Sequence, residues 1–280
     1  MPQAELSKPA VKSAVTLSLV EQARSGPFLL HLDMERGCAA AAAAGFDAVE
    51  IFAPSADSLN ARELRRLLTT HGLSLAALGT GAGWLVQRLT LTDPDLEVRA
   101  RARQFVAGLV DFGGSFGAPA IIGSMQGRVA ENQSREQALA WLAESLEQLA
   151  PRAHALGTVL LLEPLNRYET NLLNRLGDTA AFLGTLRTRN VRILVDLFHA
   201  NIEERSISES IESLGPLLGH LHFVDSNRCA PGLGHLDFAP ICSALVGIGY
   251  QGYASVEALP LPTPEAAAAA SIMSFRRLFS

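Results

Sequence analysis

Short apolar runs alternate with longer amphipathic segments along nearly the whole chain. Eight of these runs are continuous and rich in Val, Ile, Leu and Ala, as parallel strands covered on both faces are. They span residues 14–20, 48–52, 74–79, 118–123, 158–163, 191–196, 220–224 and 253–257. The segments between them carry apolar residues at helical spacing. The pattern therefore predicts strands and helices in strict alternation.

Several residues mark where the predicted helices begin and end. Asp33 precedes an alanine-rich segment and Gly45 follows it, which suits an N-cap and a left-handed residue after the C-terminus. Gly72 is expected to end the next helix in the same way. Asp93, directly before Pro94, is expected to cap the helix that follows the third strand.

Eight strand–helix units in 280 residues predict a single-domain (β/α)8 TIM barrel over residues 13–280, with residues 1–12 as an N-terminal tail. A doubly wound open sheet is the alternative. The turn after the first strand, "EQARSGPFLL", lacks the GxGxxG pattern that nucleotide-binding sheets often carry there. No linker or change in composition divides the chain, so we expect one domain.

Composition and charge narrow the classes of partner. The net charge of -5 disfavours nucleic acid or an anionic membrane as a partner, because both are usually met by basic patches. Three cysteines without a CxxC pair favour a reducing compartment over a disulfide framework. The start of the chain lacks the pattern of a signal peptide, and no apolar run has the length of a membrane span. We expect a cytoplasmic protein that acts on a small molecule, and pairing through surface helices could make it a homo-oligomer.

Four consecutive strands end in residues that can bind a metal ion. Glu163, Asp196 and Glu257 end the fifth, sixth and eighth predicted strands, and His222 lies near the end of the seventh. In a TIM barrel these strand ends meet at one face. Three crowded carboxylates raise each other's pKa unless a cation lies among them. Asp196 alone could simply cap a helix, but the repetition on four strands predicts a shared divalent metal site.

The predicted ligand set also restricts the metal. Three oxygen ligands and one imidazole favour a fairly hard ion, Mn²⁺ first, with Mg²⁺ or Co²⁺ as alternatives. Zn²⁺ fits less well because it usually takes more nitrogen or sulfur ligands. One divalent ion is therefore the expected cofactor.

Longer motifs around these residues resemble a known family. The segments "EPLNRYET", "DLFHANIEE", "HFVDSNRCAPGLGHLDF" and "SVEALPLP" resemble the xylose isomerase-like TIM barrel family. Within it they are similar to ketose 3-epimerases of the D-tagatose 3-epimerase type, and most similar to the 5-keto-L-gluconate epimerase subgroup. "GTGAGWLVQRLTLTDPD" and "IIGSMQGR" extend the resemblance into the first half. It implies a metal-dependent epimerase of a ketose or keto-sugar acid.

The resemblance also implies roles for individual residues. The metal ligands would be Glu163, Asp196, His222 and Glu257. The residues that hold the substrate would be Glu169, His199 and Arg228. Glu163 and Glu257 would exchange protons with opposite faces of the carbon next to the ketone. The metal, His199 and Arg228 would stabilise the cis-enediolate that forms between the two proton transfers.

Other functions fit parts of the same pattern. An aldose–ketose isomerase, including the hydroxypyruvate isomerase type, could use these residues to move a proton between adjacent carbons on one face. An AP endonuclease-like enzyme uses several zinc ions and a basic DNA-binding face, which this acidic chain with one ligand set does not favour. A non-catalytic barrel would be expected to have lost a ligand, and all the matched positions are filled.

Several other residues have open roles. His220 faces the same side of its strand as His222, either as a second metal ligand or as a hydrogen-bonded residue deeper in the barrel. His235 could reach the mouth of the site or serve a turn. Arg88 and Arg128 could meet a substrate carboxylate or lie in solvent.

Two further pairs are expected to be structural. Asn166 and Arg167 follow the fifth strand, and we expect them to brace their loop rather than to contact substrate. Trp84 and Phe28 could wall the pocket, but we expect them to be buried aromatic residues of the helix layer.

Overall fold

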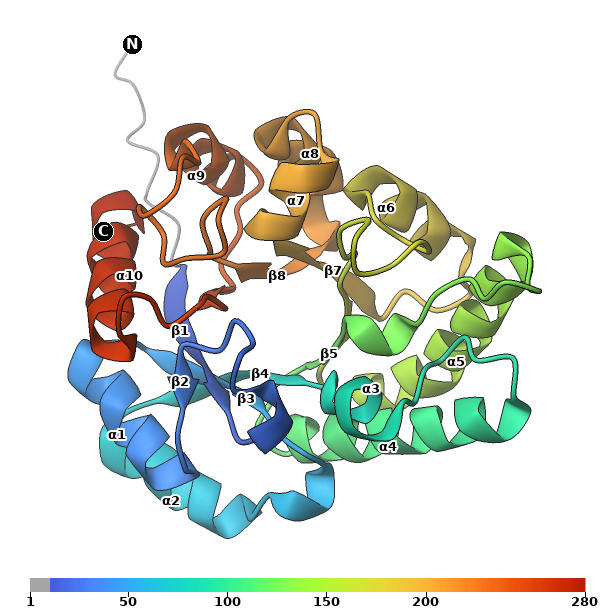
Figure 1. The fold of residues 1–280 in the computed structure, drawn as a ribbon, viewed down its shortest axis with the longest axis horizontal. Coiled ribbons are helices and arrows are strands. Elements are labelled where there is room, and N and C mark those ends of the chain that lie inside the picture. Colours follow the sequence, from blue (N-terminus) through green and yellow to red (C-terminus); the bar gives the residue numbers. More distant parts are fainter. Residues whose placement is uncertain (1–10, 280) are drawn as a thin grey trace.

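The structure is a computed structural model, and it describes residues 11–279. Its central feature is a closed parallel barrel, in which each strand pairs with the next and the last pairs with the first (Figure 1). The barrel strands are β1 (Lys12–Ser18), β3 (Ala48–Phe52), β4 (Ser74–Gly79), β5 (Ala120–Ile122), β6 (Leu160–Leu162), β7 (Val191–Asp196), β8 (Leu218–His222) and β9 (Tyr253–Val256). This closure confirms the predicted TIM barrel and excludes the open doubly wound sheet.

A ninth strand, β2 (Leu30–His31), extends one edge of β1. Leu17 and Ser18 pair with it, beyond the stretch of β1 that pairs with β9. The apolar pattern did not predict this two-residue element. Since β1 begins at Lys12, the barrel includes the last residue of the predicted tail, and residues 1–10 of that tail lie outside the described residues.

Helices surround the barrel, and α10 lies beside α1, so the two ends of the ring of helices meet (Figure 1). The helices are α1 (Met34–Ala44), α2 (Ala61–His71), α3 (Ala82–Gln87), α4 (Leu96–Gly114), α5 (Arg135–Ala155), α6 (Leu176–Thr185), α7 (Leu197–Glu203), α8 (Ile207–Leu214), α9 (Phe238–Gly247) and α10 (Pro264–Phe279). The sequence did not predict α3 and α7, which are short and lie in the loops after β4 and β7. Both therefore lie on the face where a TIM barrel builds its active site.

Most of the predicted helix ends are confirmed, and one is wrong. Asp33 accepts a hydrogen bond from the third residue of α1, and Gly45 and Gly72 have φ values of 92° and 65° after α1 and α2. The N-cap of α4 is Asp95 instead of Asp93. The helix begins two residues later than Pro94 suggested, and Asp93 accepts from the Asp95 N–H, which forms a turn before the helix.

The core has two parts. The larger apolar cluster joins the outward faces of the strands to the surrounding helices, as in other covered parallel sheets. Apolar residues fill the barrel interior below the site, in one cluster of Ala14, Ala48 and Ala76 and another of Ala77, Ile121, Leu161 and Leu194. Ala14 and Ala48 lie two residues before Thr16 and Glu50 on the same strand faces. Polar side chains can therefore occupy the upper part of the interior.

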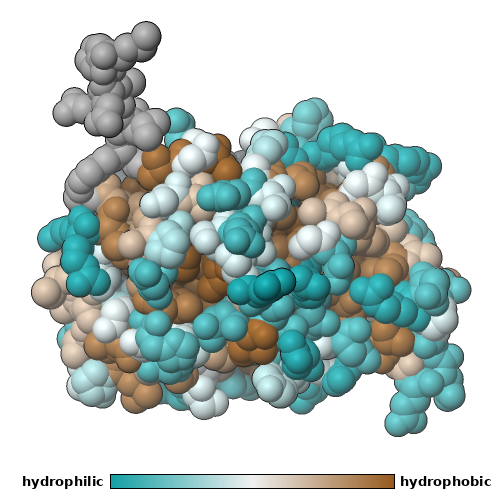
Figure 2. Space-filling model, turned by 90° about the horizontal axis from the view of Figure 1, so that it is seen from above, coloured by the Kyte–Doolittle hydropathy of each residue, from teal (hydrophilic) through white to brown (hydrophobic). Residues whose placement is uncertain are grey.

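The outer surface of the described residues has a mixed character. One face of the molecule mixes polar and apolar side chains without a dominant apolar area (Figure 2). None of the helices within residues 11–279 combines the length and the apolar character needed to cross a bilayer. The three cysteines are free, as the sequence suggested.

Candidate metal centre and active site

A cavity of about 280 Å³ opens at the carboxyl ends of the barrel strands. Glu163, His222 and Glu257 are among the residues that line it, as expected for a TIM barrel. Its walls come from the upper loops and include Phe28, Phe52, Trp84, Leu85, Leu165 and Arg228. The carboxylates predicted from the strand ends therefore face a space that can admit a small molecule.

The four predicted ligands converge. Nδ1 of His222 lies 3.3 Å from Asp196 Oδ2, 3.5 Å from Glu163 Oε1 and 3.6 Å from Glu257 Oε2. One ligand atom from each of the four residues lies within 4.8 Å of the others, which is compact enough for one ion. Asp196 and His222 end β7 and β8, whereas Glu163 and Glu257 come one residue after β6 and β9. The predicted convergence is confirmed, and metal binding remains a prediction.

The cluster strongly perturbs its own ionisation. Burial and the neighbouring carboxylate of Glu163 raise the pKa of Glu257 to about 8, against the opposing effect of His222. Burial alone would also raise the pKa of Asp196, but His199 and His222 hold it below its ordinary value. A divalent cation among these groups would favour the charged form of every carboxylate.

The two carboxylate oxygens of Asp196 have different partners. Its Oδ1 accepts hydrogen bonds from the backbone N–H groups of Phe198 and His199, at 2.7 and 3.0 Å, and so caps α7. Its Oδ2 points toward His222 and remains for an ion. The helix-cap interpretation and the metal-ligand interpretation of this aspartate are therefore compatible.

His199 presents one unpartnered ring nitrogen to the cavity. Its Nδ1 lies 2.7 Å from the Asn166 amide nitrogen, which assigns Nδ1 as an acceptor and leaves the proton on Nε2. Nε2 is buried without a hydrogen-bond partner among the described residues and lies 3.9 Å from Glu163 Oε1. This N–H can donate to a substrate oxygen. Asn166 braces its loop as predicted, because its Oδ1 accepts from the Tyr168 N–H and its amide nitrogen donates to Glu169, and the same amide also orients His199. Arg167 braces the loop through Glu203.

The guanidinium of Arg228 contacts acidic residues on two sides of the cavity. Its guanidinium lies 2.9 Å from Glu169 Oε1 and 3.6 Å from Glu257 Oε2, and it stacks 4.8 Å from the ring centre of Phe198. Its Nε is buried without a partner among the described residues. Glu169, His199 and Arg228 thus border the same cavity as Glu163, His222 and Glu257.

A family profile described as xylose isomerase-like TIM barrel matches residues 38–278. The chain belongs to this family. The D-psicose 3-epimerase of Agrobacterium fabrum is 32% identical over 195 residues, which cover 67% of this chain and 66% of that protein, just under two thirds of its length. A putative hydroxypyruvate isomerase of Streptomyces coelicolor is 31% identical over 242 residues, which cover 81% of this chain and 86% of that protein.

A solved structure shares the fold of this xylose isomerase-like protein. The D-allulose 3-epimerase from Methylomonas sp., in complex with D-allulose, superposes with a TM-score of 0.82 and covers 97% of this chain and 98% of its own. At 23% identity, this likeness supports the fold alone. The names of these two relatives are those of isomerase-class carbohydrate enzymes.

Beside the cluster of this xylose isomerase-like barrel lies a carboxylate that the sequence did not single out. Glu50, on β3, lies 2.7 Å from His220 Nε2 and 3.1 Å from His222 Nε2. Burial would raise the pKa of Glu50, but the two histidines lower it below its ordinary value. His220 is therefore the hydrogen-bonded residue deeper in the barrel. The sequence did carry a signal for Glu50, because this residue is an acid at an inward-facing position of the apolar run "AVEIF".

The loop after β8 depends on another residue that the sequence did not single out. The Asp225 carboxylate accepts hydrogen bonds from the backbone N–H groups of Ser226, Gly232 and Leu236. Arg228, within this loop, has a φ of 61° and donates its own N–H to the Asp225 carbonyl. Asp225 therefore fixes the turn that aims Arg228 into the cavity.

The remaining open residues divide between the site and the surface. Trp84 and Phe28 line the cavity, so the expectation that they belong to the helix layer is wrong. The upper loops carry them inward. Arg88 stacks on Trp84, with 5.0 Å from its guanidinium carbon to the ring centre. Arg128 lines an adjoining cavity of about 290 Å³, and His235 is exposed and lines neither cavity.

Proposed function

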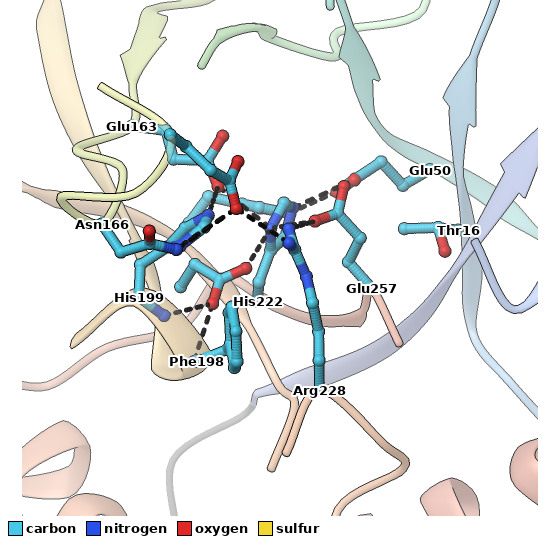
Figure 3. Close-up of polar contacts among 12 residues, drawn as sticks. Thr16, Glu50, Glu163, Asn166, Phe198, His199, His222, Arg228 and Glu257 are labelled. Atoms are coloured by element: carbon cyan, nitrogen blue, oxygen red, sulfur yellow. Dashed lines mark hydrogen bonds and ion pairs between the residues drawn. The ribbon is translucent and has the colours of Figure 1, made fainter. Parts of the chain in front are cut away.

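We propose that this protein is a divalent-metal-dependent epimerase of a ketose or keto-sugar acid, of the 5-keto-L-gluconate type, which inverts the carbon next to the ketone. One observation carries the proposal. Glu163 and Glu257, from strands separated by β7 and β8, approach His222 from two sides at the floor of an open cavity (Figure 3). Two carboxylates placed in this way can reach opposite faces of one substrate carbon.

The residues present fit one divalent ion. Three carboxylates and one imidazole offer their ligand atoms within 4.8 Å of one another, and this donor set suits Mn²⁺ best, with Mg²⁺ or Co²⁺ as alternatives. The loop after β5 leaves room for the set: a Cβ on Gly123 would collide with Glu163 Oε2. When bound, such an ion supplies Lewis acid chemistry that polarises a ketone and stabilises negative charge on adjacent oxygens.

The protein's own residues account for the proton transfers. One of Glu163 and Glu257 removes the proton from the carbon next to the ketone, and the other returns a proton to the opposite face. Negative charge then develops on two adjacent substrate oxygens. His199 Nε2–H and the guanidinium of Arg228 are placed to donate hydrogen bonds to these oxygens. Glu169, held by Arg228, would accept from a hydroxyl farther along the substrate.

The adjoining cavity supports a keto-sugar acid as the substrate. It shares Trp84, Leu165 and Glu169 with the first cavity, so the two compartments adjoin. Arg128 lines this second compartment. A substrate that places its ketone at the carboxylate cluster and extends a carboxylate into the second compartment would meet a cation there.

An aldose–ketose isomerase is the second candidate function. The relative named as a putative hydroxypyruvate isomerase covers more of the chain than the epimerase relative does. The same two glutamates would then act on adjacent carbons on one face of the substrate. The site geometry serves both reactions, so the product must decide between them.

Proton exchange in D₂O separates the two reactions. Candidate ketoses and keto-sugar acids are incubated with enzyme and Mn²⁺, and the exchanged carbons and product configurations are located by NMR. Deuterium at the carbon beside the ketone, with inverted configuration, is the expected result. An aldose product would contradict the epimerase proposal and support the isomerase. No exchange with any of these substrates would overturn both candidates.

A further inference from the structure

The carboxylate of Glu50 connects β3 to two histidines of β8, across the barrel interior. In the barrel order, β1 and β9 lie between β3 and β8, so these contacts are not those of neighbouring strands. The side chain of Glu50 is 5% exposed, and His220 and His222 are 2% exposed. A carboxylate buried to this degree is costly unless donors satisfy it. Each of its oxygens has one donor, at 2.7 and 3.1 Å.

The two ring nitrogens of His222 face different partners. Nε2 faces Glu50 Oε1, and Nδ1 faces Glu163, Asp196 and Glu257 (Figure 3). Hydrogen bonding at one nitrogen decides which nitrogen carries the proton. A proton on Nε2 is donated to Glu50, and the lone pair of Nδ1 then points at the carboxylate cluster. The opposite tautomer would set two acceptors against each other at Nε2 and would turn an N–H toward a bound cation.

We propose that Glu50 is a positioning residue for the metal centre, and that it fixes His222 in the tautomer and ring orientation in which Nδ1 can bind the ion. His220 supports this arrangement by donating its Nε2–H to the second oxygen of Glu50. A carboxylate behind a metal-binding histidine both orients the ring and makes it a better ligand. The inference rests on the metal centre of the proposed function, and it adds the strand β3 to a site otherwise built by β6 to β9.

A second metal ion held by Glu50, His220 and His222 is the competing interpretation, because their ligand atoms also lie close together. The distances favour hydrogen bonds, since 2.7 and 3.1 Å are ordinary lengths for N–H···O contacts. Each histidine also contacts a different oxygen of Glu50. The stoichiometry of binding separates the two interpretations.

The test measures metal affinity rather than turnover. Metal-free wild type, Glu50→Gln and Glu50→Leu proteins are titrated with Mn²⁺ by calorimetry, below their unfolding temperatures. Wild type is expected to bind one equivalent. Glu50→Leu is expected to bind Mn²⁺ about 10- to 100-fold more weakly than wild type. Glu50→Gln keeps a hydrogen-bond acceptor but loses the charge, so its Mn²⁺ affinity is expected to lie between those of wild type and Glu50→Leu. If Glu50→Leu does not fold, Glu50→Gln against wild type still decides the matter.

Glu204 provides the matched control. Its side chain is 4% exposed, and it accepts hydrogen bonds from the Leu176 N–H at 2.7 Å and the Ser210 hydroxyl at 2.9 Å, outside the cavity. Glu204→Gln and Glu204→Leu should lower thermal stability but leave the Mn²⁺ affinity within about threefold of wild type. Equal affinities in wild type and both Glu50 variants would overturn the positioning role.

Two further readouts test the rest of the proposal. His220→Gln keeps an N–H for Glu50 and should retain most of the affinity, whereas His220→Leu should weaken it. A second Mn²⁺ equivalent that is present in wild type and lost in Glu50→Leu would make Glu50 a ligand and overturn its positioning role. No Mn²⁺ binding by wild type would overturn the metal centre as well, whereas failure of the substrate assignment alone would leave these affinities unchanged.

Discussion

At the scale of single residues, the carboxylates of Asp196 and Glu257 have different surroundings. Asp196 gives one oxygen to two backbone N–H groups of α7, which stabilises its charged form and makes it unsuited to carrying a proton. Glu257 has the opposite environment, because burial and Glu163 raise its pKa to about 8. We propose that Asp196 only binds the ion, since its backbone donors favour its charged form, and that Glu163 and Glu257 transfer the protons.

Replacing either proposed acid–base residue tests this assignment. Glu163→Gln and Glu257→Gln should each lower kcat by about 10²- to 10⁴-fold, because an amide cannot exchange the proton. The surface variant Glu212→Gln should keep wild-type activity. Bound metal is measured in the same samples, together with circular dichroism. Near-normal turnover in either site variant, with the fold and metal intact, would contradict the assignment.

Asn166 should influence catalysis without influencing metal binding. Its amide donates to His199 Nδ1 at 2.7 Å and so keeps the proton on Nε2, which faces the cavity. Asn166→Ala should therefore lower kcat by about 10-fold, equivalent to roughly 1.4 kcal/mol, and should leave the Mn²⁺ affinity unchanged. Steady-state kinetics and calorimetry measure the two effects. Arg167→Ala, which removes only the surface contact with Glu203, is the neighbouring control.

At the scale of elements, the loop that carries Arg228 depends on Asp225. A non-glycine residue with a φ of 61° is uncommon, and such a conformation persists where surrounding contacts hold it. Three backbone N–H groups donate to the Asp225 side chain. The sequence shows an aspartate three residues before an arginine, but it does not show that the turn brings these donors together.

Removing the Asp225 carboxylate should affect both stability and substrate binding. Asp225→Ala leaves three partly buried N–H groups without their acceptor, and an unsatisfied buried group costs about 1–3 kcal/mol. The free energy of unfolding, measured in urea, should fall by about 2–4 kcal/mol, and KM should rise as Arg228 loses its position. Asp237→Ala removes a cap of α9 with one N–H donor, so it should cost less stability and leave KM unchanged. Equal KM values in wild type and Asp225→Ala would contradict the role of the turn.

The elements that the sequence predicted well are those with a continuous apolar pattern. All eight barrel strands were found because both faces of each strand are covered, although β5 and β6 are shorter than the apolar runs that contain them. The short helices α3 and α7 were missed because six or seven residues give too little periodicity. The order of the barrel strands followed from the order of the chain, so the four ligands at the ends of β6 to β9 could be predicted as one site.

At the scale of the whole molecule, the contacts that the sequence could not show cross the barrel or join separate loops. Glu50 reaches His222 from β3, and Arg228 reaches Glu169 from a loop two strands away. Neither pair is close in sequence or on neighbouring strands. Such pairings depend on barrel closure and on side-chain length, which a one-dimensional pattern does not contain. The positions of the candidate site residues could therefore be predicted more fully than the side-chain contacts that support them.

Closure of the barrel around buried acids makes the stability of the metal-free protein depend on pH. Glu257 has a pKa of about 8 in the folded protein against an ordinary value of 4.5, so between these values the folded state holds a proton that the unfolded state has released. Burial alone would lower the pKa of His222, but the carboxylates of Glu50 and Glu257 raise it well above 6.5. The folded state therefore also holds the proton of His222 more tightly than the unfolded state does. Both groups therefore contribute stability to the metal-free protein that is lost as the pH rises toward 8.

A bound cation should reverse this trend, because it replaces those protons and binds the deprotonated ligands. From about pH 6 to about pH 8.5, the free energy of unfolding of metal-free protein should fall by at least about 1.4 kcal/mol, the equivalent of one pKa unit. The stabilisation by Mn²⁺ should grow over the same range. Urea unfolding at both pH values, with and without Mn²⁺, measures this difference. Metal-free Glu257→Gln should show a flatter dependence, because it lacks the group that titrates. A metal-free wild type as stable at the higher pH as at the lower would show that the four groups do not share one buried, proton-compensated site.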